Sequence, residues 1–277
     1  MLVDGRAIAA ELHERLAHAV GGLSQPPQLA IVIVGDDPVI ESFVRIKKKI
    51  AEKLGISVIE RRFDASVLAS ELLDAVKKLS EERTVDGIII QLPLPSPIET
   101  QAILDAVPLK KDVDMLATHS VAAFRRGDAP VLPPVVGAIE EILERNAVAV
   151  TGKDVLIIGH GRLVGAPAEL FFRHNDAHVT VIGREVERLS ELTKEADIII
   201  SGAGQPGLLK PEMLKHGVVL IDAGTSESGG KIVGDAEPSC AEVASIFTPV
   251  PGGVGPIAVA LIFKNLLLLA KASRILK

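Results

Sequence analysis

The chain has 277 residues, of which 48% are hydrophobic, and it contains 7 Phe but no Trp or Tyr, so we expect one large or two ordinary domains with an aliphatic core. The net charge of −6 gives no electrostatic reason to expect a nucleic-acid partner, and a single cysteine, Cys240, excludes an internal disulfide and a cysteine-rich zinc site. The first residues do not resemble a signal peptide, and the apolar runs are short and interrupted, so the sequence predicts a cytoplasmic protein without a membrane span.

In the first half of the chain, apolar strands alternate with amphipathic helices. Residues 28–35, QLAIVIVG, form a continuous apolar run that ends in Gly, which is typical of a strand buried on both faces. The next segment has apolar residues at helical spacing, and a strand, a helix and a further strand are predicted after it. The expected elements are a helix over 42–56, a strand over 57–63, a helix over 69–82 and a strand over 86–95. This alternation predicts a parallel sheet.

The second half repeats the same alternation after a proline-rich stretch at 129–137. Residues 153–175 predict a strand, a Gly-rich turn and a helix, and more apolar strands are expected at 178–183, 196–204, 217–224 and 245–250. The fold class is therefore α/β with two domains. We expect an N-terminal catalytic domain over 1–137 and a Rossmann-like dinucleotide-binding domain over 138–255.

The Gly-rich turn is the first sign of chemistry. Gly159, Gly161 and Gly165 form the pattern GxGxxxG directly after a predicted strand and before a predicted helix. Such a turn brings backbone N–H groups against a pyrophosphate at a helix N-terminus, so it predicts dinucleotide binding. The strand VTVIG is followed by Arg184, which could pair with a 2′-phosphate and favours NADP, whereas Glu185 keeps NAD open.

Polar residues in the first half could form a second site. Lys47 follows Phe43 by four residues, so both project from one helical face. Gln91 follows a predicted strand at the edge where open α/β sheets bind ligands, and KKDVDML places Asp112 and Asp114 in a loop. Spacing alone does not prove that a lysine, an amide and a carboxylate converge.

The segment PVPGGVGP (249–256) crowds three prolines and three glycines before the last apolar segment. A rigid hinge would explain it, and so would a wall of a binding site that side chains would obstruct. The two interpretations do not exclude each other.

Taken together, the motifs SFVRIKKK, DGIIIQLPLP, KKDVD, GHGRLVGAP and TPVPGGVGP resemble, in order, those of the bifunctional methylenetetrahydrofolate dehydrogenase/cyclohydrolase family. The resemblance covers nearly the whole chain. It implies that the C-terminal helix, within 256–277, returns to complete the first domain, and that the protein is a homodimer acting on tetrahydrofolate derivatives.

The resemblance also assigns roles by position. It implies catalytic roles for Lys47, for Gln91, which tunes it, and for Asp114, which holds the pterin. The implied folate-binding residues are Phe43, Leu92, Pro251, Gly252, Gly253 and Gly255. The implied cofactor-binding residues are Gly159, His160, Gly161, Arg162, Val164, Gly165, Arg184, Gly204 and Thr225. No metal is implied.

The implied activity has two steps in one-carbon metabolism, which supplies purine biosynthesis. NADP-dependent oxidation converts 5,10-methylenetetrahydrofolate to the 5,10-methenyl cation, and water then gives 10-formyltetrahydrofolate. A neutral Lys47 would serve this chemistry better than an ammonium, so we expect burial to lower its pKa.

Several residues depart from the family pattern. Phe43 replaces Tyr, Gly161 replaces Ser and Met115 replaces Gly; LPPVV (132–136) stands in place of PCTP, and Ile257 and Ala258 in place of Met and Thr. These changes leave two alternatives open: a dehydrogenase that lacks cyclohydrolase activity, and a non-catalytic paralogue that binds nucleotide or folate.

Overall fold

The computed structural model describes residues 1–183 and 188–275. The chain forms two compact units. Unit 1 consists of residues 1–10 and 135–258, and unit 2 consists of residues 11–134 and 259–277. Helix α1 (Gly5–Gly21) and helix α9 (Val254–Ile275) therefore contribute residues to both units.

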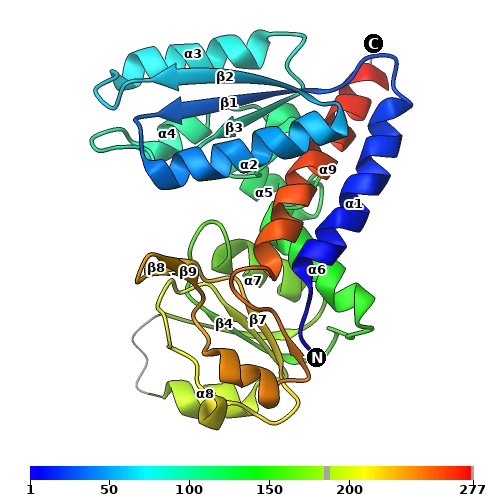
Figure 1. Cartoon of the computed structure of the whole chain (residues 1–277), viewed down its shortest axis with the longest axis vertical. Helices are drawn as coiled ribbons and strands as arrows, with labels where there is room; N and C mark the ends of the chain where they lie inside the picture. The colour runs from blue at the N-terminus through cyan, green and yellow to red at the C-terminus, as the bar shows by residue number, and fades with distance from the viewer. Residues whose placement is uncertain (184–187, 276–277) are drawn as a thin grey trace. The chain divides into compact units, whose positions relative to one another are not determined.

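Unit 2 is built on a three-stranded parallel sheet in the order β2-β1-β3. Its strands are β1 (Gln28–Val34), β2 (Ser57–Phe63) and β3 (Gly87–Ile90). Helices α2 (Pro38–Leu54) and α3 (Ala69–Glu81) cover opposite faces of this sheet (Figure 1). The central strand β1 is buried from its second residue onward, as the continuous apolar run predicted.

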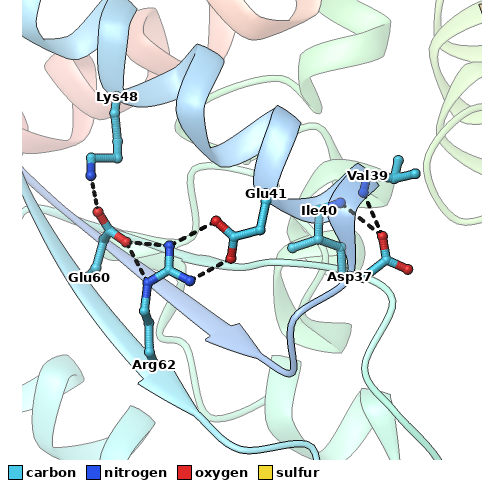
Figure 2. A network of polar contacts seen from close by, with 7 residues as sticks. All are labelled: Asp37, Val39, Ile40, Glu41, Lys48, Glu60 and Arg62. Carbon is cyan, nitrogen blue, oxygen red and sulfur yellow. Dashed lines mark hydrogen bonds and ion pairs between the residues drawn. The ribbon is translucent and has the colours of Figure 1, made fainter.

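Helix α2 is fixed at both ends and along its side. The Asp37 side chain accepts hydrogen bonds from the N–H groups of Val39 and Ile40, and Gly55 ends the helix in a left-handed conformation. Along the side, Arg62 of β2 bridges Glu41 of α2 and Glu60 of β2, and Lys48 of α2 also pairs with Glu60 (Figure 2). This ion-pair network joins the outer strand β2 to the helix that carries Lys47.

Unit 2 is completed by short helices and by the C-terminal part of α9. The short elements are α4 (Thr100–Leu104), the 3₁₀ turn η1 (Leu109–Lys111) and α5 (Thr118–Arg126). A Cβ on Gly87 of β3 would lie 2.6 Å from both Leu266 and Val113, so α9 and the loop after η1 pack directly on this strand. The resemblance therefore predicted correctly that the last helix returns to the first domain.

Unit 1 is a five-stranded parallel sheet in the order β10-β7-β6-β4-β5, which is the expected Rossmann-like arrangement. Its strands are β4 (Asp154–Ile158), β5 (His178–Ile182), β6 (Ile198–Ser201), β7 (Val219–Asp222) and β10 (Ile246–Phe247). Its helical elements are α6 (Pro134–Arg145), α7 (Gly165–His174), α8 (Leu189–Glu195), η2 (Pro211–Met213) and η3 (Pro238–Glu242). A hairpin of β8 (Ser226–Ser228) and β9 (Lys231–Val233), which the sequence did not predict, follows β7.

The first residues of the chain pack with unit 1. The Val3 N–H donates to the Phe247 carbonyl at 2.8 Å, and the Phe247 N–H donates to the Met1 carbonyl at 2.9 Å. This pairing extends the sheet beyond β10, a contact between chain ends that local sequence patterns do not reveal.

The apolar stretch of helix α9 is longer than the short, interrupted runs that were expected. Residues Val254–Arg274 are long and apolar enough to cross a membrane by length and composition, and an 18-residue window within them has a mean hydropathy of 1.7. In the structure 61% of that window is buried inside the protein, and a buried core helix passes the same test. The apolar run was therefore longer than our sequence reading allowed.

Candidate active site

Lys47 and Gln91 form the centre of the candidate site in unit 2. Lys47 lies on the inner face of α2, and Gln91 follows the last residue of β3. Both are buried, and the Lys47 ammonium nitrogen Nζ donates to Gln91 Oε1 at 2.7 Å. The structure thus brings together two residues that the sequence could only place on separate elements.

Burial controls the charge of this lysine. It lowers the pKa of Lys47 from its ordinary value because the ammonium loses hydration, while the nearby Asp114 carboxylate acts in the opposite direction. Burial likewise raises the pKa of Asp114 to about 6; the charge of Lys47 lowers it, and that of Asp112 raises it. The lysine and the carboxylate are therefore electrostatically coupled, and the amine is easier to deprotonate than in water.

Hydrogen bonds made by Lys111 and Asp112 fix the loop that carries Asp114. Lys111 Nζ donates to the carbonyls of Leu79 and Glu82 at the end of α3, at 3.3 and 2.7 Å. Asp112 Oδ2 accepts from the Ala117 N–H at 2.9 Å. These neighbours have structural roles, which leaves Asp114 as the acidic group of the loop that couples to Lys47.

Met115 adopts a positive φ of 58° in the same loop. The resemblance implied Gly at this position, and Gly adopts a left-handed conformation without a steric cost. The Met115 side chain is nevertheless buried at 1% exposure, so packing offsets the backbone strain.

Phe43 and Leu92, the two predicted folate contacts in unit 2, lie close in sequence to the catalytic pair. Phe43 is 37% exposed one helical turn before Lys47, and Leu92 directly follows Gln91 and is half-buried. An exposed aromatic ring beside a buried amine offers a stacking surface for a flat ring system.

The Gly-rich turn of unit 1 fits a dinucleotide phosphate. Gly159 has a φ of 87°, and a Cβ there would lie 2.7 Å from the Gly202 carbonyl oxygen. A Cβ on Gly165, the first residue of α7, would lie 1.8 Å from the Gly159 carbonyl oxygen, so the turn is packed tightly on the helix start. A Cβ on Gly161 would meet nothing within 4 Å, which leaves open space at the turn.

The other predicted cofactor residues lie on the carboxyl edge of the same sheet, with one exception. His160 pairs with Glu169 of α7 at 2.8 Å, Val164 packs against Gly202, and Arg162 is exposed. Gly204 and Thr225 are exposed in the turns after β6 and β7. Arg184 lies outside the described residues.

The three glycines of the loop 249–256 differ in their surroundings. Gly252 has a φ of 115°, which favours glycine. A Cβ on Gly253 would lie 2.7 Å from Thr248 Cβ, so packing within unit 1 requires glycine at position 253. A Cβ on Gly5 would lie 1.8 Å from the Gly253 carbonyl oxygen, so position 5 requires glycine as well. A Cβ on Gly255 would meet nothing within 4 Å, and Pro251 is exposed, so these two are free to line a ligand.

Sequence reasoning missed several buried polar residues. Asn265 of α9 donates to the Val113 carbonyl at 2.9 Å and to the Leu132 carbonyl at 2.8 Å, which ties down the loop of Asp114. Asp222, Asp235, Ser201 and Thr248 form a second buried network in unit 1. A polar residue inside an apolar run, such as Asn265 in ALIFKNLLLLA, is the signal that could have found them.

Residues 1–183 and 188–275 contain no group of three or more His, Cys, Asp or Glu side chains that could hold a metal ion.

Comparison with known proteins matches both units. Residues 3–114 match the family model described as tetrahydrofolate dehydrogenase/cyclohydrolase, catalytic domain, and residues 133–274 match the model of its NAD(P)-binding domain. The chain is 37% identical to the "Bifunctional protein FolD" of Methanospirillum hungatei over 96% of this chain and 95% of that protein.

Two solved structures extend this similarity to the fold. The bifunctional FolD enzyme of Campylobacter jejuni has a TM-score of 0.94 and 33% identity, covering 98% of this chain and 99% of that one. The FolD of Trypanosoma brucei, solved with NADP cofactor and an inhibitor, has a TM-score of 0.93 and 32% identity, covering 99% and 98%.

Proposed function

The chain belongs to the tetrahydrofolate dehydrogenase/cyclohydrolase family, and from that premise we propose that it oxidises 5,10-methylenetetrahydrofolate with NADP and hydrolyses the product to 10-formyltetrahydrofolate. The observation that carries the proposal is the buried hydrogen bond between Lys47 Nζ and Gln91 Oε1 beside Asp114. This arrangement gives a lysine whose pKa is lowered and whose position is fixed.

NADP fits the residues present in unit 1. The turn at Gly159–Gly165 would hold its pyrophosphate, and the turns after β6 and β7 would line its path along the sheet edge. When bound, the cofactor supplies the hydride acceptor of the first step.

Lys47 has its main role in the second step. A neutral amine that donates one N–H to Gln91 keeps its lone pair available, so it can accept a proton from the water that attacks the methenyl carbon. A neutral Lys47 also avoids placing a second positive charge beside a cationic substrate. Asp114, ionised above its pKa of about 6, supplies a negative charge that accepts hydrogen bonds from the pterin ring.

Two assays on the purified protein test this function. We expect NADPH formation from 5,10-methylenetetrahydrofolate, and decay of 5,10-methenyltetrahydrofolate faster than its spontaneous hydrolysis. The Lys47→Met variant should lose the enzymatic decay while keeping reduced hydride transfer, because the first step needs geometry more than a base. Lys49→Met, an exposed lysine of the same helix, is the matched control and should behave as the unmodified protein. Unaltered decay in Lys47→Met would contradict the role of Lys47.

Phe43 favours one alternative, a dehydrogenase without cyclohydrolase activity. Its ring brings no hydroxyl group to the helical face that carries Lys47. NADPH formation without accelerated decay of the methenyl compound would establish that alternative. A non-catalytic paralogue would give neither activity, and the intact Lys47–Gln91 bond counts against it.

We propose further that the protein acts as a homodimer in the cytoplasm. The sheet of unit 1 ends at β5, and among residues 1–183 and 188–275 no other strand pairs with its outer side; such a strand edge can pair with a second copy. The single cysteine, Cys240, is a buried free thiol, which suits a reducing compartment. Light scattering tests the homodimer, and cell fractionation tests the cytoplasmic location.

A further inference from the structure

Two buried aspartates of unit 1 have no role in the chemistry described so far. Asp222 is the last residue of β7 and is 1% exposed, and Asp235 follows β9 and is fully buried. Burying two carboxylates in one region is costly unless their oxygens are well hydrogen-bonded. Their partners therefore indicate what the pair holds in place.

Asp235 binds the turn that follows β6. Its Oδ2 accepts from Ser201 Oγ at 2.6 Å and from the Ala203 N–H at 2.8 Å, and its Oδ1 accepts from the Gln205 N–H at 2.7 Å. These donors span residues 201–205, the turn that contains Gly204 and whose Gly202 carbonyl lies against Gly159 of the Gly-rich turn. One side chain thus fixes the whole turn after β6.

Asp222 binds the turn that follows its own strand. Its Oδ1 accepts from the Gly224 N–H at 2.9 Å, and its Oδ2 accepts from the Ala236 N–H at 2.8 Å, beside Asp235. Its own N–H donates to Thr248 Oγ1 at 2.7 Å, which connects this turn to the residue just before the loop 249–256. Asp222 therefore holds the backbone next to Thr225 and both ends of the β8–β9 hairpin.

The two carboxylates also interlock with each other's backbone segments. A Cβ on Gly224, which Asp222 binds, would lie 2.3–2.4 Å from the carboxylate atoms of Asp235. A Cβ on Gly234, the neighbour of Asp235, would lie 2.2 Å from Asp222 Oδ2. The fit requires glycine at both positions, so movement of one carboxylate displaces the segment held by the other.

We propose that Asp222 and Asp235 are positioning residues for the dinucleotide: together they hold the turns after β6 and β7 in the conformation that binds NADP. The inference rests on the proposed function. Burial raises the pKa of Asp222 to about 6, the backbone N–H of Ala236 lowers it, and the charge of Asp235 raises it. Ionisation of Asp222 at this buried position therefore opposes folding, as is common for groups that maintain a binding site rather than stability.

Asp235→Asn tests the proposal, because its amide NH₂ would face one of the backbone N–H donors. Calorimetric titration with NADP should show a dissociation constant raised about tenfold or more, and KM for NADP should rise while KM for the folate and kcat change little. The milder Ser201→Ala variant removes one donor and should raise the constant about threefold. Melting temperatures of all variants accompany the titrations.

Asp197→Asn is the matched control. Asp197 lies at the opposite end of β6, where it accepts from the Asp154 N–H at 3.3 Å and pairs with Lys215 at 2.7 Å. It should lower the melting temperature without altering NADP affinity.

Unchanged NADP affinity in folded Asp235→Asn would overturn the proposal. The proposal would also be overturned if the Asp197→Asn control lost as much NADP affinity as Asp235→Asn. If Asp235→Asn does not fold, unchanged affinity in Ser201→Ala overturns it instead. Failure of the unmodified protein to bind NADP would overturn the proposed function itself, which separates the two failures.

Discussion

At the scale of single residues, we attribute the reactivity of the proposed site to one buried amine. Lys47 is one of three consecutive lysines, and only its place on the inner face of α2 removes it from water. Its hydrogen bond to Gln91 and its coupling to Asp114 determine its pKa and orientation. The substitution of Tyr by Phe at position 43 removes a hydroxyl from the same helical face.

The Phe43→Tyr change should therefore raise hydrolysis. A hydroxyl one helical turn from Lys47 adds a hydrogen bond worth about 0.5–1.5 kcal/mol, or about a three- to tenfold faster turnover. The rate of hydrolysis is measured by stopped-flow decay of methenyltetrahydrofolate. The rate of NADPH formation should change less. Phe43→Leu is the control without a hydroxyl; an equal gain there would show that ring removal, not hydrogen bonding, is responsible.

Asp114 should give the reaction a pH dependence with a step near pH 6. Its pKa is about 6, so below that pH it becomes neutral and binds the pterin less well, and KM for the folate should rise about tenfold by pH 5. The hydrolytic rate should also rise with pH as Lys47 loses its proton. In Asp114→Asn the step near pH 6 should be absent; its persistence would assign the step to another group.

At the scale of elements, helix α9 packs on the core of unit 2 and also holds the loop of Asp114 in place. Helix α9 is almost wholly apolar, yet Asn265 on it donates to two backbone carbonyls, those of Val113 and Leu132. The first lies next to Asp114, and the second lies in the LPPVV stretch that departs from the family pattern. The helix therefore anchors the loop that supplies the acidic group of the site.

Asn265→Leu should remove the hydrogen bonds that hold the loop of Asp114 against helix α9. Two buried carbonyls would lose their donors at a cost of about 2–5 kcal/mol in the free energy of unfolding, and KM for the folate should rise because Asp114 is less well placed. Denaturant melts and folate titrations measure the two effects. Lys264→Met, at the exposed neighbouring position of α9, should leave both unchanged. A stability loss with unaltered KM would limit Asn265 to a role in the core.

At the scale of the whole molecule, the proposed catalytic residues and the Gly-rich turn lie in different units. Lys47, Gln91 and Asp114 lie in unit 2, and the Gly-rich turn and the carboxylate pair lie in unit 1. A protein with both sites binds two chemically different ligands in its native state, and each should stabilise it.

Thermal melting should therefore respond to both ligand types. At 100 times its dissociation constant, either NADP or a folate analogue should add about 2.7 kcal/mol to the free energy of unfolding. NAD at the same concentration should give a smaller shift than NADP. A response to NADP alone would show that the folate site is lost, as in a nucleotide-binding paralogue.

The sequence by itself determined the two α/β domains and the order of most strands and helices. These follow from local information: apolar periodicity and turn glycines. The set of Lys47, Gln91 and Asp114 was implied by the family resemblance of the motifs and stays a prediction. The sequence also located the Gly-rich turn, because strand, turn and helix are consecutive.

Only the tertiary structure decided which polar residues are buried and what they bind. Lys47 meets Gln91 across 44 positions, Asn265 meets Val113 across 152, and Met1 joins the sheet at Ser245 across 244. No local pattern encodes such pairs, because each depends on how separate elements pack. Burial then sets the pKa of Lys47 and Asp114 and makes glycine necessary at positions 224, 234 and 253, where neighbouring atoms leave no room for a Cβ.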